Sequence, residues 1–278
     1  MIGLGFACPS FEWAHYAFMQ HALLAVILIA PLFAMLGCMV ISNQMAFYSE
    51  AVGHAALTGI AIGVLFGFAD PMGPMLVFAV LLALGISCLR RYSAASMDTV
   101  IGLVMSFAVA LGVVLLSRGG GFARYSRYLI GDILTVTPGE LGRLVFVVVA
   151  VLAVWTTIFN RIFFVSVNRS LARSRGMNAW LVEALLASVV ALVVTVTIPW
   201  VGLLVINSLL ILPAAAARNI STNTPRYYLG SILISLLSGL MGLISSFYWG
   251  TASGATIVLF AMGFFLLSLA LRRAKGRG

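Results

Sequence analysis

The feature that most constrains this chain is a series of long apolar stretches separated by polar connections. A helix needs roughly 20 apolar residues to cross about 30 Å of hydrocarbon, and each stretch is close to that length. The stretches do not resemble the short alternating strands of an outer-membrane barrel. They lie at residues 18–41, 48–68, 74–89, 98–117, 142–163, 179–198, 201–217, 228–249 and 253–271. The sequence therefore predicts an all-α transmembrane bundle of about nine spans, with eight as the alternative because the third and seventh stretches are short.

The composition excludes the soluble alternatives. Hydrophobic residues make up 63% of the 278 residues and charged residues only 8%, against about 25% charged residues in an ordinary soluble domain. A soluble protein cannot bury this much apolar surface. A soluble enzyme, a secreted disulfide scaffold and a disordered chain are therefore excluded, and the odd number of cysteines implies no disulfide framework.

Residues 1–278 form a single transmembrane domain in this interpretation, because no linker or second domain is visible. Residues 118–143 are too long and too polar to be one simple connection. The half-apolar stretch 128–134 within them is too short to cross a membrane. We expect a short helix at about 124–135 that lies in, or dips into, the outer face.

The basic residues predict the orientation, since cytoplasmic loops are enriched in Lys and Arg. With the N-terminus outside, twelve basic residues fall on the inner side and four on the outer side. The four outer residues are Arg118, Arg124, Arg127 and Arg143. The chain is therefore expected to have its N-terminus outside and its C-terminus inside. The arginines are scattered between apolar runs, which does not indicate nucleic-acid binding.

A glutamate and a histidine stand at the start of the second stretch. Glu50 and His54 are four residues apart, so on a helix they share a face, about 6 Å apart along the axis. An ionisable pair in a membrane span is costly and is by default a functional hypothesis. Carboxylate and imidazole together suit zinc, manganese or iron, and two chains related by a twofold axis would supply four ligands. The alternative is an interfacial glutamate that its neighbouring histidine satisfies by a hydrogen bond.

A proline, four alanines and an arginine end the seventh stretch. These residues are Pro213, Ala214, Ala215, Ala216, Ala217 and Arg218. Alanine is the best helix former and leaves a smooth surface. The segment is either a Pro-kinked span end whose arginine reaches the membrane interface, or a short helix that is presented to a cytoplasmic partner.

The remaining polar residues favour structural roles. Asp98 is well placed to cap the helix that it begins. Glu183, His15 and His21 are expected near the membrane surfaces. Asp132, in the expected outer helix, fits either a structural or a functional role.

The chain lacks the motifs that would make it an enzyme. It has no phosphate-binding loop of the Gly-x-x-x-x-Gly-Lys-Ser/Thr type, and its single lysine, Lys275, lies in the C-terminal tail. It also has no His-Glu-x-x-His or Cys-x-x-Cys motif. A transporter built from this chain therefore needs an ion gradient or a separate motor subunit.

These stretches together resemble the membrane permeases of the manganese, zinc and iron ABC importers, over residues 17–271. Residues 45–57 resemble that family's Asp-x-x-x-His-Ala segment, and residues 98–102 match the start of its next long helix. Residues 128–134 match its Phe-Gly-Asp-Ile-Leu element. Residues 201–218 match its Val-Gly…Leu-Leu-Ile-Pro-Ala-Ala-x-Ala-Arg segment, which is the most specific of the four.

The resemblance implies a permease without its own ATPase site, in the prokaryotic inner membrane, of the type related to cobalamin and siderophore permeases. It implies a second permease chain, identical or paralogous, two cytoplasmic ATPase subunits and an extracytoplasmic metal-binding protein that delivers the ion. Glu50 and His54 then belong to the metal path, and the metal is cargo rather than a permanent cofactor. Residues 213–226 are assigned to coupling with the ATPase.

The outer arginines are not explained by topology. Four like charges near one segment repel each other unless a partner neutralises them. We expect Arg118, Arg124, Arg127 and Arg143 to form a docking surface for carboxylates of the delivery protein. The alternative is binding to lipid phosphates at the outer interface.

The sequence departs from the family pattern at several positions, which bear on the metal preference rather than on the class. Glu50 stands where Asp is usual, and Thr58 where Pro is usual. Residues 43–44 replace a basic pair, and residues 249–250 replace an acidic position. Residues 131–138 resemble zinc members slightly more than the others. A gradient-driven transporter and a non-transport membrane subunit are the alternative functions.

Overall fold

The structure is a computed structural model that describes residues 12–68, 70–119, 132–167, 174–274 and 276. Within these residues it has nine long α-helices, one at each stretch predicted from the sequence, and no β-strand. The long helices are α1 (Ala17–Ser42), α2 (Tyr48–Leu65), α3 (Met72–Tyr92), α4 (Met97–Gly119), α6 (Pro138–Val167), α8 (Ala179–Val201), α9 (Leu203–Ile220), α10 (Thr224–Trp249) and α11 (Ser253–Ala274). Two 3-10 turns, η1 (Glu12–His15) and η2 (Ile133–Thr135), complete the described elements. The all-α prediction is confirmed.

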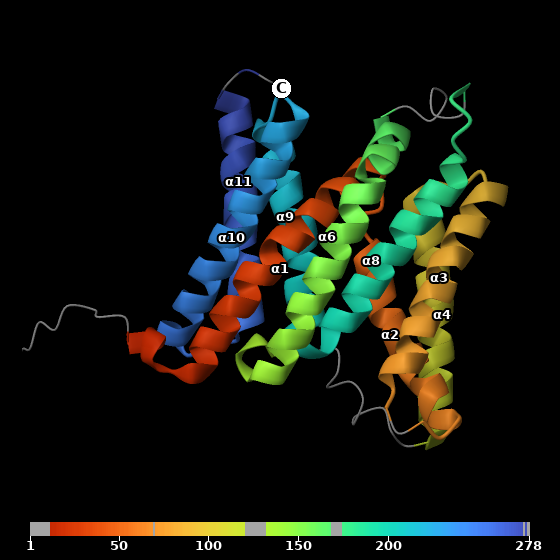
Figure 1. The fold of residues 1–278 in the computed structure, drawn as a ribbon, viewed down its shortest axis with the longest axis horizontal. Coiled ribbons are helices and arrows are strands. Elements are labelled where there is room, and N and C mark those ends of the chain that lie inside the picture. Colours follow the sequence, from red (N-terminus) through yellow and green to blue (C-terminus); the bar gives the residue numbers. More distant parts are fainter. Residues whose placement is uncertain (1–11, 69, 120–131, 168–173, 275, 277–278) are drawn as a thin grey trace, which may run out of the picture.

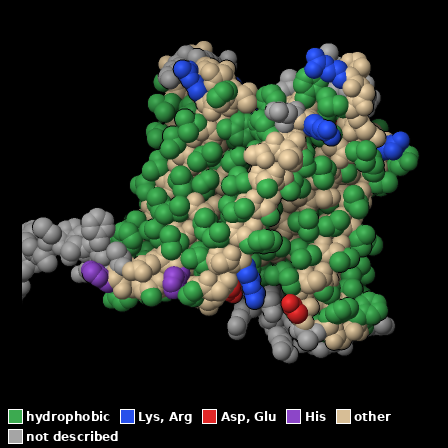
Figure 2. Space-filling model, in the orientation of Figure 1, with side chains coloured by type: hydrophobic (Ala, Val, Ile, Leu, Met, Phe, Trp, Pro, Cys, Tyr) green, Lys and Arg blue, Asp and Glu red, His purple; other side chains and the backbone are tan. Residues whose placement is uncertain are grey.

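Successive long helices run through the bundle in alternating directions. Figure 1 therefore shows η1 at the bottom and the C-terminal end of the chain at the top. Most of the basic side chains visible in Figure 2 lie at the top. Arg90 and Arg91 end α3 there, and Arg272 and Arg273 end α11. This distribution agrees with the predicted orientation, with the N-terminus outside and the C-terminus inside.

The choice between nine and eight spans depends on α2. Eight of the helices that the structure describes are long and apolar enough to cross a membrane, and they include α3 and α9, which correspond to the two short stretches. The ninth helix, α2, is only 18 residues long. Its first turns carry Glu50 and His54, and these polar side chains lower its mean hydropathy. The residues that weaken α2 as a span are thus the candidate metal ligands.

α2 starts part-way through the bundle rather than at its inner surface. Tyr48, its first residue, is fully buried, and its hydroxyl donates a hydrogen bond of 2.9 Å to the carbonyl of Ala187. Ala187 lies eight residues into α8 from its inner end, which corresponds to roughly 12 Å along the helix axis. Non-helical backbone at membrane depth is tolerated only where protein buries it or where it lines a cavity. The start of α2 therefore lies at a depth where irregular backbone needs a local reason.

The turn between α1 and α2 is partly buried, and its buried residues are hydrogen-bonded within the chain. Asn43 is 7% exposed and Met45 is 1% exposed. Their backbone N–H groups donate to the carbonyls of Met39 and Val40, at 3.0 and 2.9 Å. The Asn43 side-chain amide also donates to the Met39 carbonyl, at 2.9 Å. Gln44 adopts a positive φ of 59° to make the reversal. These contacts fix the inner end of α2 against α1.

Contacts between helices arrange the bundle in two rows. One row contains α11, α9, α2 and α4, and the other contains α10, α1, α6, α8 and α3. Glycines allow close approach between the rows: Gly37 of α1 packs on the backbone of Leu210 in α9, and Gly59 of α2 packs on the backbone of Met75 in α3. Small residues at such contacts let helix backbones approach closely in membranes. α9 and α2 consequently lie in the middle of their row, each held against the second row.

The structure describes only the last residues of the short outer helix expected at about 124–135. Residues 124–131 lie outside the described residues. Ile133–Thr135 form a single 3-10 turn, and Ile133 is 1% exposed, in contact with the main core. A carboxylate oxygen of Asp132 accepts a hydrogen bond of 3.0 Å from the backbone N–H of Leu134, which starts this turn. Asp132 thus has a structural role as a cap, and the turn anchors the connection to the outer end of the bundle.

Candidate metal-transport site

Glu50 and His54 occupy the first two turns of α2 and lie next to each other. Nε2 of His54 is 3.9 Å from a carboxylate oxygen of Glu50, which is longer than a hydrogen bond. The side chain of Glu50 is 41% exposed and that of His54 is 35% exposed. Their neighbours Ser49, Ala51 and Gly53 are buried. The pair is therefore the open part of an otherwise buried helix start.

The two side chains have unused donor capacity for a cation. A carboxylate carries two acceptor oxygens, and a neutral imidazole carries one acceptor nitrogen. In the described structure, Glu50 and His54 contact each other only at 3.9 Å. Carboxylate oxygen and imidazole nitrogen are ligands for zinc, manganese and iron. The geometry permits both side chains to bind one ion.

One chain by itself provides few strong metal ligands here. In the part of the chain that the structure describes, no three His, Cys, Asp or Glu side chains gather closely enough to hold an ion. Transition-metal sites generally use four or more ligands. A complete shell at Glu50 and His54 therefore requires a second chain, other donor types or water.

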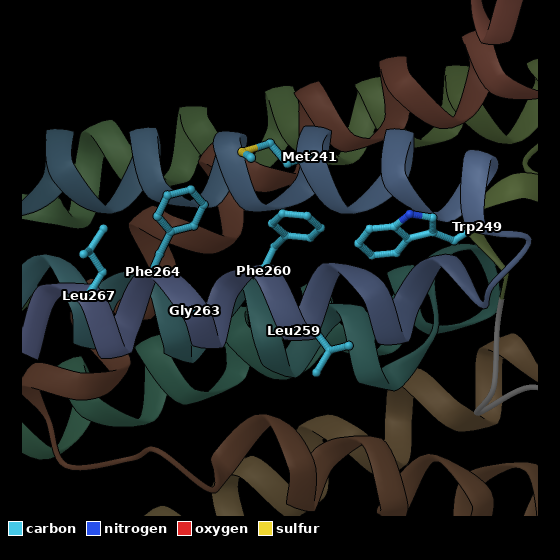
Figure 3. A pocket seen from close by; sticks show the side chains of 7 residues that line it. All are labelled: Met241, Trp249, Leu259, Phe260, Gly263, Phe264 and Leu267. Carbon is cyan, nitrogen blue, oxygen red and sulfur yellow. The ribbon is translucent and has the colours of Figure 1, made fainter.

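A groove between α10 and α11 has different chemistry (Figure 3). Its volume is about 500 Å³, and the rings of Trp249 and Phe260 stack within it, with centroids 6.4 Å apart. The groove is lined by Met241, Trp249, Leu259, Phe260, Gly263, Phe264 and Leu267. None of these side chains is a ligand for a hard or borderline metal ion. The groove is therefore separate from the candidate metal path.

The proline–alanine segment forms the inner part of α9 rather than a separate short helix. α9 runs without interruption through Pro213 to Ile220. The smooth alanine face packs inside the chain, because Ala214, Ala216 and Ala217 are all 0% exposed, whereas Ala215 is partly exposed. The exposed residues of segment 213–226 are Arg218, Ile220, Thr222, Asn223, Pro225 and Arg226. The residues of this segment that are more than partly exposed therefore begin at Arg218.

The structure describes the outer arginines only in part. Arg143 is exposed in the first turns of α6, at the outer end of the bundle. Arg118 belongs to the last turn of α4, at the same end. Arg124 and Arg127 lie outside the described residues. Of the four arginines in the proposed docking surface, Arg143 is the one whose exposure the structure describes.

Glu183 forms an ion pair that the sequence did not reveal. Its carboxylate oxygen lies 3.1 Å from a guanidinium nitrogen of Arg90, with the side chains 15% and 17% exposed. Beside this pair, the indole N–H of Trp180 donates to the carbonyl of Ser87, at 3.1 Å. Arg91 lies 5.8 Å from the centre of a Trp180 ring. These contacts join the inner ends of α3 and α8, which are far apart in the sequence.

The other polar residues occupy the ends of helices. Ser96, not Asp98, caps α4, since its Oγ accepts a hydrogen bond of 3.2 Å from the backbone N–H of Thr99. Asp98 is exposed in the first turn, where its charge still favours the helix N-terminus. His15 is exposed in η1, and His21 is partly exposed near the outer end of α1. Among the described residues, neither Asp98 nor these two histidines gather with Glu50 and His54 into a group of three that could hold a metal ion.

Thr58, which stands where Pro is usual in the resembled family, has a structural role. Its hydroxyl donates a hydrogen bond to the carbonyl of Ala108 in α4. Gly112, one turn further along α4, packs directly on Thr58. This close contact fixes α2 against α4, one turn beyond His54. A proline here would lack the hydroxyl and could not make this bond.

The bundle and its open Glu50–His54 pair define a multi-pass helical membrane protein with donors for a cation inside the span. The model of the ABC 3 transport family matches residues 15–272, and the chain belongs to that family. The resemblance to metal ABC importer permeases that the sequence motifs indicate is thereby confirmed.

Relatives whose names state a transport system match nearly the whole chain. The chain is 32% identical to the high-affinity zinc uptake system membrane protein ZnuB of Haemophilus influenzae, over 89% of this chain and 95% of that protein. It is 26% identical to the manganese transport system membrane protein MntC of Listeria monocytogenes, over 94% and 93%. The solved structure of PsaBC from Streptococcus pneumoniae in complex with Fab matches with a TM-score of 0.78 and 28% identity, covering 92% of each chain.

Proposed function

We propose that this chain is the permease subunit of an ATP-driven importer of a divalent transition-metal ion, with zinc as the favoured cargo. The observation that carries the proposal is the Glu50–His54 pair at the start of α2. It places a carboxylate and an imidazole part-way through the bundle, on an open side. Ionisable groups at such depth are costly and mark ion paths.

Zinc-system relatives match this chain at 27–32% identity and manganese-system relatives at 26–30%, so identity does not separate the two metals. The zinc preference has two other supports. Residues 131–138 resemble zinc members of the family. Imidazole suits zinc, and zinc also binds more tightly than manganese to a given nitrogen and oxygen site. Manganese is the closest competing cargo, since carboxylate oxygens suit it well.

The proposal requires partners, because the chain has no phosphate-binding loop. Two permease chains, identical or paralogous, bring their Glu50–His54 pairs to a shared axis and double the number of ligands. Two cytoplasmic ATPase subunits supply the driving force. They contact the exposed surface of segment 213–226, and α9 carries the movement from Arg218 toward α2, because it is one continuous helix.

An extracytoplasmic metal-binding protein delivers the ion to the outer end of the bundle. Exposed Arg143, with Arg118, Arg124 and Arg127, attracts carboxylates on that protein and orients it. Binding of these arginines to lipid phosphates is the competing interpretation.

The test is metal uptake by the complete transporter in proteoliposomes, with a double variant, Glu50→Ala with His54→Ala. We expect uptake of radioactive zinc to be lost while the variant still assembles with the ATPase. His21→Ala is the matched control, because His21 is a partly exposed histidine at the outer end of α1. Normal uptake by the double variant would refute the metal path. Uptake without ATP would instead support a gradient-driven transporter.

A further inference from the structure

α9 carries one polar side chain on the face that is not buried within the chain. Between residues 203 and 211, the side chains that are not buried are Leu204, Asn207 and Ile211. Their spacing of three and four residues places them on one face of the helix. Asn207 is the polar member of this face. Asn207 is thus partly exposed, while its Oδ1 atom is buried.

The helix register places Asn207 at the level of Glu50. Gly53 of α2 packs directly on the side chain of Leu203, at the start of α9. α2 and α9 run in opposite directions (Figure 1). One turn forward along α9 from Leu203 therefore faces one turn back along α2 from Gly53. Those turns carry Asn207 on α9 and Glu50 on α2.

Two oxygen atoms at this level are buried without a hydrogen-bond partner. Among the described side chains, only four buried nitrogen or oxygen atoms are in this state, and they include Oδ1 of Asn207 and Oγ of Ser49. Leaving a buried oxygen without a hydrogen bond destabilises the folded state. The neighbouring Ser208 differs, because its hydroxyl donates to the carbonyl of Val205, at 3.0 Å. Ser49 and Asn207, each one turn from the Gly53–Leu203 contact, thus carry buried oxygens without a hydrogen-bond partner.

We propose that Oδ1 of Asn207 is a third ligand from this chain to the transported metal ion, together with Glu50 and His54. The inference rests on the proposed function above. The amide oxygen is a neutral, hard donor, and such carbonyl oxygens suit manganese better than zinc. Asn207 therefore sets selectivity: it lets a pair that favours zinc also accept manganese, by raising the share of oxygen ligands.

The experiment compares Asn207→Leu with Ser208→Ala in the complete transporter, by uptake of radioactive zinc and manganese into proteoliposomes. Asn207→Leu removes the amide oxygen and keeps the number of heavy atoms in the side chain. We expect the KM for manganese to rise about 10-fold or more, as for the loss of a group that tunes a metal site. The ratio of zinc to manganese uptake should rise with it. Ser208→Ala, which removes a hydroxyl that already has a partner, should leave both quantities unchanged.

Asn207→Asp keeps the shape and makes the oxygen anionic, so it should retain uptake of manganese with a KM no higher than that of the natural chain. This variant decides the matter if Asn207→Leu does not assemble. If Asn207→Asp raised the manganese KM as much as the loss of an unrelated polar side chain does, the proposal would be overturned.

A purely structural role has a different signature. If Asn207 only hydrogen-bonds to Ser49, then Asn207→Leu and Ser49→Ala lower the thermal unfolding midpoint but leave the KM values and the metal ratio unchanged. That outcome overturns the assignment. If the Glu50/His54 double variant loses uptake while Asn207→Leu keeps the KM values and the metal ratio of the natural chain, Asn207 does not belong to the path and the proposed function stands. Normal uptake by the double variant removes both.

Discussion

Two acid–base side-chain pairs of the described structure, Arg90–Glu183 and Glu50–His54, contrast in distance and in surroundings. Arg90 and Glu183 lie 3.1 Å apart, and their side chains are 17% and 15% exposed. Glu50 and His54 lie 3.9 Å apart, and their side chains are 41% and 35% exposed. The first pair joins two helices at the inner surface of the bundle. The second lies on one helix, part-way through it.

The difference shows what each pair can do. Arg90 and Glu183 satisfy each other with a charge-assisted hydrogen bond, and both side chains are mostly buried, so little capacity is left for a ligand. Glu50 and His54 are too far apart for a hydrogen bond and are open on one side, so their lone pairs remain available to a cation. A close, shielded pair holds helices together, whereas a loose, open pair inside a membrane is suited to transport.

The largest effect is expected from a glutamate-to-glutamine substitution in the open Glu50–His54 pair. Glu50→Gln removes the charge that attracts the ion while keeping the shape of the side chain. We expect uptake to fall by about 100-fold or more, equivalent to at least about 2.8 kcal/mol of metal affinity. The thermal unfolding midpoint should stay within the error of the natural chain. Radiometal uptake and unfolding in detergent measure the two quantities; a destabilised variant with normal uptake per folded molecule would reverse the comparison.

In segment 213–226, the effect of a new carboxylate should depend on whether the substituted side chain is exposed or buried. Arg218→Glu reverses an exposed charge, so we expect the chain to fold while transport per ATP hydrolysed falls about 10-fold, because this contact with the ATPase carries charge. Ala216→Glu places a carboxylate where the side chain is 0% exposed, so folding should fail instead. Uptake and ATP hydrolysis measured together distinguish the two results. Tight coupling in Arg218→Glu would place the contact elsewhere.

Glu183→Gln should produce a stability effect instead of a transport effect. It leaves Arg90 partly buried without its anionic partner, which costs about 1.5–3 kcal/mol for a hydrogen bond to a charged group. The thermal unfolding midpoint should fall, and uptake per assembled transporter should not change. A double variant that exchanges the two residues, Arg90→Glu with Glu183→Arg, should recover part of the loss. Failure of Glu183→Gln to lower the midpoint would mean that the pair does not hold α3 to α8.

The smallest effect is expected at the outer surface. Arg143 is exposed, and a charge at a solvated rim chiefly affects the rate of association. Arg143→Glu should slow association with the delivery protein a few-fold at low salt and leave its dissociation unchanged. Basal ATP hydrolysis serves as the control and should stay constant. Unaltered association kinetics at low salt would favour lipid phosphates as the partners of this arginine.

The sequence by itself determined the class, the helices and their directions. Apolar length is a local property, because each span must satisfy its own backbone in hydrocarbon. All nine stretches are therefore helices, with ends displaced by a few residues, as at α6, which begins at Pro138 rather than near residue 142. The spacing of Glu50 and His54 is also local, so the helical period alone brought them together.

Only the tertiary structure decided what surrounds each of these elements. It placed the start of α2 inside the bundle through Tyr48 and Ala187, and it buried the alanine face of α9. It also paired Arg90 with Glu183, 93 residues away. Such contacts depend on which helix faces lie together, and a uniformly apolar sequence carries little information about its faces. Asn207 is a further example. The sequence does not relate it to Glu50; the packing of Gly53 on Leu203 does, because it sets the register of the two helices.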